Sequence, residues 1–173
     1  MPHRFSGEIS RKLDYKNRLA IPEDVVLDAN EGKLSHVLVI RGKTEGEPAA
    51  PFLSLYELED WRAIVESASK SLQDPDEMRL FMHHHAADAQ RLDVDNMRRV
   101  TLPAPLLQYA KIDKEVKVVG FWDHIEVWAV EEHQAYLGML EREGVPFPSI
   151  ADLSRYIDRY GRPPQGGPGV GNA

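Results

Sequence analysis

One ten-residue pattern occurs twice in this chain of 173 residues. The first copy runs from Leu13 to Pro22 and the second from Val94 to Pro103, and both read apolar-Asp-x-x-x-Arg-apolar-x-apolar-Pro. The second copy follows the first by 81 positions, as Asp95 follows Asp14 (95 minus 14). An internal repeat of this kind indicates two similar structural units, so it constrains the fold before any other pattern is interpreted.

The same order of elements is expected around each copy. Alternating apolar and polar residues predict a strand on either side of a polar loop, and the closing proline favours the start of a short helix. In the first half we expect strands at 8–14, 18–21, 35–41 and 52–56, with helices at 23–30, at 57–72 and from 74 to 87 or 89. In the second half we expect strands at 91–95, 99–102, 115–121 and 125–128, with helices at 103–110, 130–142 and 149–160. Neither half can close a core alone, so the two should pair about a pseudo-twofold axis.

The charge of the whole chain, −7 at pH 7, argues against a generic nucleic-acid binder, because contact with phosphates needs a basic surface. The segment from Met1 to Pro22 differs, because its five Lys and Arg residues outnumber its two acidic residues and give a local charge of +3. A basic loop on an acidic body is consistent with both observations.

The chain contains no cysteine, which excludes disulfides and thiolate chemistry. Its N-terminus lacks the apolar run of a signal peptide, and no segment approaches the roughly 18 apolar residues of a membrane span. We therefore expect a cytoplasmic protein without a membrane partner.

The doubled pattern, the hairpin after each copy and their spacing resemble MraZ, a family of bacterial transcriptional regulators. The resemblance covers roughly residues 7 to 142. It implies an α+β, mainly β fold of two tandem, pseudo-repeated SpoVT/AbrB-type swapped-hairpin domains, double-split β-barrel-like, with outer helices. It also implies that the loops bind double-stranded DNA at repeated promoter boxes, and that subunits assemble into a ring-like homo-oligomer.

These expectations divide the chain into five parts. We predict a first SpoVT/AbrB-type domain at 7–57, a helical connector at 58–88, a second domain at 89–132, a C-terminal helical region at 133–160 and a disordered tail at 161–173. The tail prediction rests on a high content of glycine and proline with almost no apolar residues.

The predicted DNA-binding residues lie in the two loops and in the strand before the first loop. They are Arg11, Lys12, Lys16, Asn17, Arg18, Arg98 and Arg99, with Asp14 and Asp95 as loop-positioning residues. A guanidinium group is always charged and can bind phosphate or guanine through two parallel hydrogen bonds. An aspartate is unfavourable beside phosphate, so each is expected to accept hydrogen bonds from its own loop. A purely structural role for the Asp–Arg pairs, as braces beside a turn, stays open.

Two positions depart from the pattern of the family. Its members usually have Gly before each Arg, where this chain has Asn17 and Arg98. Asn accepts a positive φ, whereas Arg is harder to place there. Members also tend to carry basic residues just after the proline, where this chain has Glu23 and Asp24. These acids would weaken phosphate contacts beside the first loop, so we expect a divergent member.

Other patterns favour no chemistry. The consecutive His83, His84 and His85 point in different directions on a regular helix and cannot all reach one ion, so no metal or other cofactor is predicted. Trp122 and Trp128 are expected in the core or in a subunit interface. The chain has no Gly-rich phosphate loop and no hydrolase or metalloprotease pattern, so an enzyme is not predicted.

Two functional hypotheses follow. The first is a sequence-specific DNA-binding transcriptional regulator, associated with the nucleoid, that acts by occupying promoter DNA. The second is an antitoxin-like protein-interaction module with weak or lost DNA binding. Salt distinguishes the two, because phosphate contacts weaken steeply as the salt concentration rises.

Overall fold

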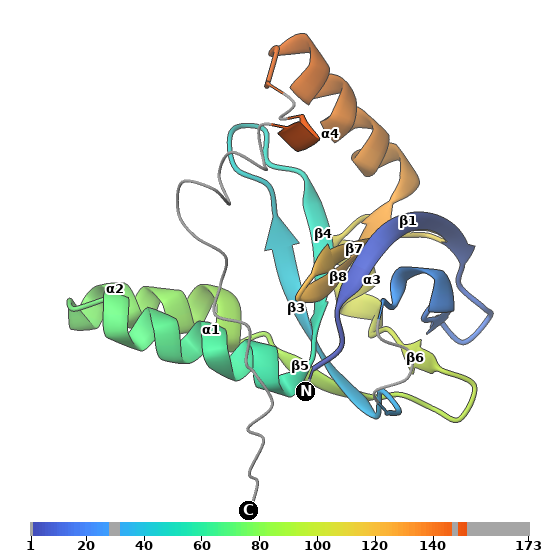
Figure 1. The fold of residues 1–173 in the computed structure, drawn as a ribbon, viewed down its shortest axis with the longest axis horizontal. Coiled ribbons are helices and arrows are strands. Elements are labelled where there is room, and N and C mark those ends of the chain that lie inside the picture. The colour runs from blue at the N-terminus through green and yellow to red at the C-terminus, as the bar shows by residue number, and fades with distance from the viewer. Residues whose placement is uncertain (1, 28–31, 147–148, 152–173) are drawn as a thin grey trace, which may run out of the picture. The chain divides into compact units, whose positions relative to one another are not determined.

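The computed structural model describes residues 2–27, 32–146 and 149–151 of the chain (Figure 1). In chain order its elements are β1 (Phe5–Lys12), β2 (Arg18–Ala20), η1 (Glu23–Val25), β3 (His36–Lys43), β4 (Pro51–Tyr56), α1 (Leu58–Ser71), α2 (Pro75–Phe81), η2 (Met82–Ala86), β5 (Gln90–Asp93), β6 (Arg99–Thr101), α3 (Ala104–Tyr109), β7 (Glu115–Trp122), β8 (His124–Ala129) and α4 (Val130–Arg142). The order strand, loop, strand, short helical segment, hairpin, helix therefore occurs in each half.

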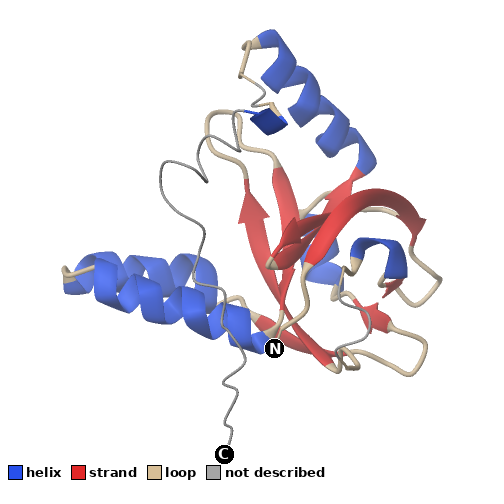
Figure 2. Cartoon of the chain, viewed as in Figure 1, coloured by secondary structure: helices blue, strands red, loops and turns tan. Residues whose placement is uncertain are grey.

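Strands of both halves interleave in one antiparallel sheet of order β1-β7-β8-β4-β3-β5. Figure 2 shows these strands in red. Strand β1 of the first half pairs with β7 of the second along its whole length, and β5 of the second half pairs with β3 of the first. The two hairpins meet where β4 pairs with β8. Each half thus lends its first strand to the hairpin of the other half, and the sheet exists only when both halves are present.

A second sheet of two strands, β2 and β6, joins the segments that follow the two repeated loops. Its inward residues Leu19 and Val100 are completely buried. They belong to one core with residues of both hairpins, including Val39, Leu55 and Val118. Because this core draws on both halves, the β2–β6 pair is fixed against the larger sheet by apolar packing.

The two hairpins differ in their connections. Residues 44–50 link β3 to β4, whereas Asp123 alone links β7 to β8. Beside the short turn, Gly120 lies against the backbone of β1, where an added Cβ atom would approach the Ser6 nitrogen to 2.4 Å. Only glycine permits this approach, which lets β1 pair closely with β7.

The mainly β, α+β class predicted from the sequence is confirmed, but the larger sheet is open, with β1 and β5 at its ends. The helix predicted at 23–30 is longer than the helical segment in the structure. Only Glu23–Val25 form a single 3-10 turn, because Val26 is extended and forms a bridge with Phe5, while residues 28–30 lie outside the described part.

The chain separates into two compact units, residues 1–137 and 138–173, and both sheets belong to the first. Helix α4 covers Val130–Arg142, the range predicted from the sequence. The expected helix at 149–160 is described only at its first residues, and the predicted tail at 161–173 lies outside the described residues. No helix in the described part of the chain combines the length and apolar character needed to cross a membrane.

Candidate nucleic-acid interface

The first repeated loop is held by the carboxylate of Asp14. Its Oδ1 atom accepts hydrogen bonds from the backbone N–H groups of Lys16 (2.8 Å) and Arg18 (3.0 Å), and its Oδ2 atom accepts one from Arg18 Nε (2.6 Å). The backbone N–H of Asn17 donates to the Asp14 carbonyl oxygen at 3.0 Å, which closes a tight turn. Asn17 takes a φ of +58°, a left-handed conformation that asparagine tolerates.

The second loop repeats this geometry. Asp95 Oδ1 accepts from the backbone of Met97 (2.8 Å) and Arg99 (2.9 Å), and Oδ2 accepts from Arg99 Nε (2.8 Å). Arg98 adopts a φ of +59°, almost the angle of Asn17. The turn therefore imposes the left-handed conformation on arginine as well, although that conformation costs a non-glycine residue about 1–2 kcal/mol.

The β2–β6 pair connects the loops and fixes the spacing of their arginines. Arg18 lies opposite Thr101, and Arg99 lies opposite Ala20. Because side chains alternate along a strand and Leu19 is buried, Arg18 and Arg99 share the outer face of this small sheet. Their neighbours across the strands are small, so neither guanidinium group is crowded by the opposite strand.

Each loop arginine uses only part of its hydrogen-bonding capacity. Arg18 and Arg99 donate from Nε to their aspartates, and within the described part of the chain their Nη atoms form no further hydrogen bond. Their side chains are 23% and 25% exposed. The terminal nitrogens can therefore bind a second acceptor, and the aspartate fixes the plane of the guanidinium group.

Both loop carboxylates are charged over the physiological pH range. Desolvation raises the pKa of Asp14, but hydrogen bonds from Arg18 and Lys16 and the charge of Arg18 outweigh it, so the pKa lies below its ordinary value. The backbone N–H of Arg99 is the main cause of the lowered pKa of Asp95, helped by the Arg99 side chain and opposed by desolvation. Neutralisation of either group therefore needs strongly acidic conditions.

The remaining predicted residues do not form one uniform surface. Lys12 and Lys16 are exposed, and the Lys16 ammonium lies 5.5 Å from the ring centroid of the exposed Tyr15. Arg11 forms an ion pair with Asp24 at 3.6 Å, and Arg98 forms one with Glu23 at 2.5 Å. These two cations are thus paired with acids, as Arg18 and Arg99 are with Asp14 and Asp95.

That these acids form ion pairs with Arg11 and Arg98 was not predicted from the sequence. Glu23 and Arg98 were each identified as departures from the family pattern, and the fold brings the two departures together. Lys33 was not predicted at all, and its Nζ atom donates to Asn96 Oδ1 at 2.8 Å in the second loop. No local pattern marks Lys33, because it reaches the loop from a segment distant in the sequence.

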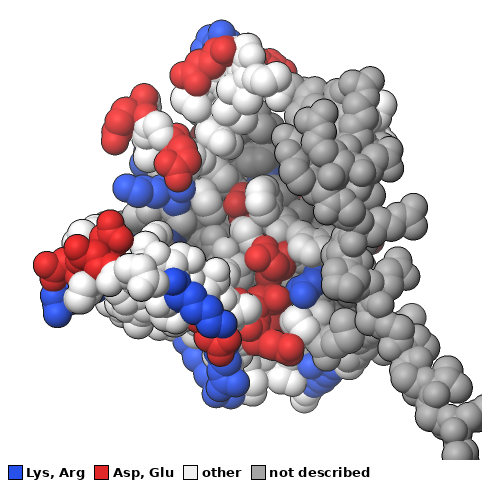
Figure 3. All heavy atoms as spheres, turned by 60° about the vertical axis from the view of Figure 1, so that its left-hand side comes forward, with Lys and Arg blue, Asp and Glu red and all other residues white. Residues whose placement is uncertain are grey.

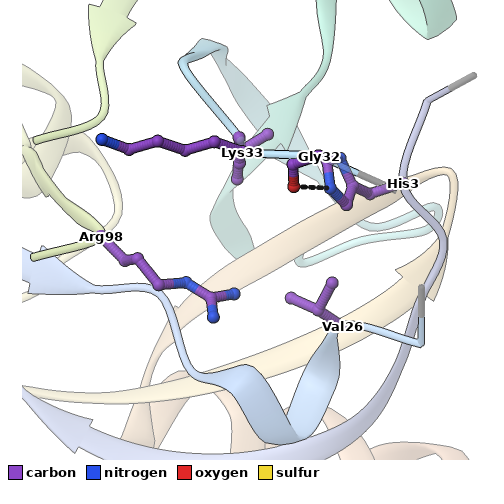
Figure 4. Close-up of a pocket in the computed structure, with 6 residues that line it drawn as sticks. His3, Val26, Gly32, Lys33 and Arg98 are labelled. Atoms are coloured by element: carbon purple, nitrogen blue, oxygen red, sulfur yellow. Dashed lines mark hydrogen bonds between the residues drawn. The ribbon is translucent and has the colours of Figure 1, made fainter. Parts of the chain in front are cut away.

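A cavity of about 260 Å³ lies beside the second loop. In Figure 4 the Arg98 side chain extends toward Val26, with Lys33 above it, and the dashed line joins His3 Nε2 to the Gly32 carbonyl oxygen at 3.1 Å. The residues that line the cavity include the cations Lys33 and Arg98. Arg98 also forms the ion pair with Glu23.

The other patterns considered in the sequence lie away from these loops. His83, His84 and His85 belong to η2, and no group of three or more His, Asp or Glu residues among those described could hold a metal ion. Trp128 is buried and stacks on Phe52, with 4.5 Å between ring centroids. Trp122 is 62% exposed, so it is not a core residue.

Charge is unevenly distributed over the molecule. On the face shown in Figure 3, acidic and basic side chains are interspersed, and a group of acidic side chains lies near its centre. The acidic side chains on this face are consistent with the net charge of −7 of the whole chain.

Comparison with known proteins identifies similar chains. The family model described as "MraZ protein, putative antitoxin-like" matches residues 86–158. The chain is 32% identical to the transcriptional regulator MraZ of Thermomicrobium roseum, over 85% of this chain and 94% of that protein. It is 33% identical to the protein of the same name from Desulforamulus reducens, over 79% and 89%. With that of Histophilus somni strain 2336 it shares 31% identity, over 77% and 84%.

Proposed function

The chain belongs to the MraZ family, whose matched relatives are named transcriptional regulators, and from this premise we propose that it binds double-stranded promoter DNA through its two repeated loops. The observation that supports this proposal most directly is the matched pair Arg18 and Arg99. Both lie on the outer face of the β2–β6 sheet, and both have Nη atoms available to a second acceptor. Such groups suit guanine or phosphate.

In the proposed complex the loops face the DNA, and Asp14 and Asp95 orient the arginines without contacting phosphate. Lys16 and Lys12 add positive charge near the first loop, and Asn17 offers an amide at its tip. The fold provides no catalytic step in this proposal. Regulation follows from occupancy of the promoter, which would locate the protein in the cytoplasm at the nucleoid.

One loop pair makes few contacts, and the chain as a whole is acidic, so we propose that affinity comes from several subunits on repeated DNA boxes.

The helical pair α1–α2 supports self-association. It buries only Asp60 of α1 and no residue of α2, whereas helices this short depend on burial of an apolar face for their stability. A groove of about 950 Å³, lined by residues such as Trp61, Leu80 and Phe81, borders these helices. A second copy of the chain is the proposed occupant, and repetition of this contact would close a ring.

The test is fluorescence-anisotropy binding to duplex DNA from upstream of the protein's own gene, at two salt concentrations. We expect salt-sensitive, sequence-selective binding by the wild type. The Arg18→Ala/Arg99→Ala variant should bind at least tenfold more weakly, because loss of each bidentate interaction costs about 1–3 kcal/mol. Size-exclusion chromatography and circular dichroism serve as controls that the variant remains folded and assembled.

Failure to bind this DNA even at low salt would contradict the proposal. The antitoxin-like alternative predicts a different result, in which the protein binds a protein partner with little dependence on salt or on Arg18. An intact fold in the double variant, combined with unchanged DNA affinity, would show that the Asp–Arg pairs only brace their turns.

A further inference from the structure

Two acidic residues occupy the surface beside the candidate interface. Glu23 and Asp24 open η1, which is separated from the end of β2 by two residues, and their side chains are 77% and 73% exposed. Glu23 Oε1 lies 2.5 Å from Arg98 Nη1, and Asp24 Oδ2 lies 3.6 Å from Arg11 Nη2. Each acid therefore neutralises one of the cations predicted to meet DNA.

Comparison of the two repeats shows that these acids and their arginine partners have no charged counterparts in the equivalent positions. At the offset of 81 positions, the counterparts of Glu23 and Asp24 are Ala104 and Pro105. The counterparts of their partners Arg98 and Arg11 are Asn17 and Leu92. Both ion pairs thus occur on one side of the pseudo-twofold axis, and the equivalent positions on the other side carry no charge.

Stability of the fold does not account for this arrangement. An ion pair between exposed side chains contributes little to folding, because water and salt screen it. Its effect on an approaching polyanion is larger, because the arginine must exchange a carboxylate for a phosphate while the carboxylate stays nearby. The part of the interface that contains Arg98 and Arg11 therefore offers less attraction to DNA than its number of arginines suggests.

We propose that Glu23 and Asp24 are intramolecular counter-ions that compete with DNA phosphate for Arg98 and Arg11, and so lower affinity and leave the electrostatic contacts mainly to Lys16, Arg18 and Arg99. The inference rests on the proposed DNA binding and goes beyond it, because it assigns a role to two acids. Weak electrostatic attraction leaves discrimination to direct contacts with the bases, since phosphate contacts carry no sequence information.

The test compares Glu23→Gln and Asp24→Asn with the wild type in anisotropy titrations over a series of salt concentrations. Each variant keeps the shape of the side chain and removes its charge. We expect each to bind the same duplex about threefold to tenfold more tightly at low salt. The plot of log affinity against log salt concentration should steepen by about 0.9 for each additional phosphate that the variant neutralises.

A double-mutant cycle tests the pairing itself. Arg98→Ala should weaken binding more in the Glu23→Gln background than in the wild type, by about threefold, because Arg98 contacts phosphate fully only without its counter-ion. Glu66→Gln is the control, because it changes the net charge equally on α1, whose neighbours are β3 and α2. Thermal melts check that the exposed substitutions leave the fold intact.

The outcomes separate the two proposals. DNA binding that depends on Arg18 but is unchanged by Glu23→Gln and Asp24→Asn, or raised equally by Glu66→Gln, overturns the counter-ion role and leaves the proposed function standing. Absence of binding in every variant at low salt overturns both. Tighter binding with a steeper salt dependence in the Glu23 and Asp24 variants alone supports both.

Discussion

Arg98 is the residue whose backbone departs most from what its type prefers. Its φ of +59° places it in the left-handed region beside Asn17 at +58°. The turn tolerates this because Asp95 accepts three hydrogen bonds that do not depend on the identity of residue 98. The side chain forms an ion pair with Glu23, which offsets only part of the conformational cost because it is exposed.

Replacement of Arg98 by glycine should therefore stabilise the fold. We expect Arg98→Gly to raise the free energy of unfolding by about 0.5–1 kcal/mol, because relief of the left-handed strain exceeds the added entropy of the unfolded chain. Urea denaturation measures this change. Asn17→Gly is the matched control and should change stability by a smaller amount, and a destabilised Arg98→Gly variant would refute the strain argument.

Much of the candidate site could be predicted at this scale. The doubled Asp-x-x-x-Arg pattern identified both loops, and the expectation that each aspartate accepts hydrogen bonds from its own loop agrees with the contacts of Asp14 and Asp95. The contact between Glu23 and Arg98 could not be predicted, because these residues are 75 positions apart and meet only when β2 pairs with β6. The use of the loops for DNA binding stays a prediction.

At the scale of elements, the pairing of β1 with β7 depends on a close approach of two backbones. Gly7 lies opposite Gly120 in this ladder, and a Cβ atom on Gly120 would meet the Ser6 nitrogen at 2.4 Å and its Cα at 2.7 Å. Backbone atoms cannot yield as a flexible side chain does. The position therefore requires glycine for space, at a negative or extended φ where other residues are otherwise allowed.

We expect Gly120→Ala to lower the free energy of unfolding by about 2 kcal/mol or more, because β1 must shift away from β7. Thermal or urea denaturation measures the loss. Gly138→Ala in α4 is the comparison, since an added Cβ there meets only the end of the Arg142 side chain at 3.4 Å. That variant should gain about 0.5–1 kcal/mol from helix propensity. Equal effects at both positions would contradict the steric explanation.

The types of the elements and the two hairpins could largely be predicted from the sequence, whereas the extent of the segment after Pro22 could not. Alternation of apolar and polar residues identified the strands, and Pro103 marked the start of α3. The segment after Pro22 was assigned as a longer helix because its acids suit a helix start, yet Val26 pairs with Phe5 and ends the turn. That bridge is a tertiary contact, and local propensity contains no information about it.

At the scale of the whole molecule, the α1–α2 pair leaves its apolar residues poorly covered within a single chain. Its apolar residues are partly or fully exposed, and Leu80 on α2 is 59% exposed at the edge of the adjoining groove. A surface of this kind on a short helical pair is typical of contact with another protein. The proposed assembly therefore depends on these helices, while the loops remain available to DNA.

We expect Leu80→Glu to reduce the molar mass of the assembly in solution, because a charge would be buried in the contact between copies. Analytical ultracentrifugation measures the mass. Affinity for DNA with several boxes should fall by at least tenfold, as avidity is lost, whereas affinity for a single box should change little. Ala63→Glu is the control, because it adds the same charge at an exposed position of α1 that does not line the groove. An unchanged mass for Leu80→Glu would exclude this face as the contact.

The alternation of the two halves in the sheet also bears on how the chain folds as it is synthesised. When the ribosome has produced β1, β3 and β4, the partner of β1 and the second partner of β4 have not yet been translated, because these are β7 and β8, near the end of the described chain. The nascent first half therefore exposes unpaired strand edges, which are prone to pair with another chain. Contacts between such distant segments also make folding slow. The larger sheet can therefore be completed only after β8 has been synthesised.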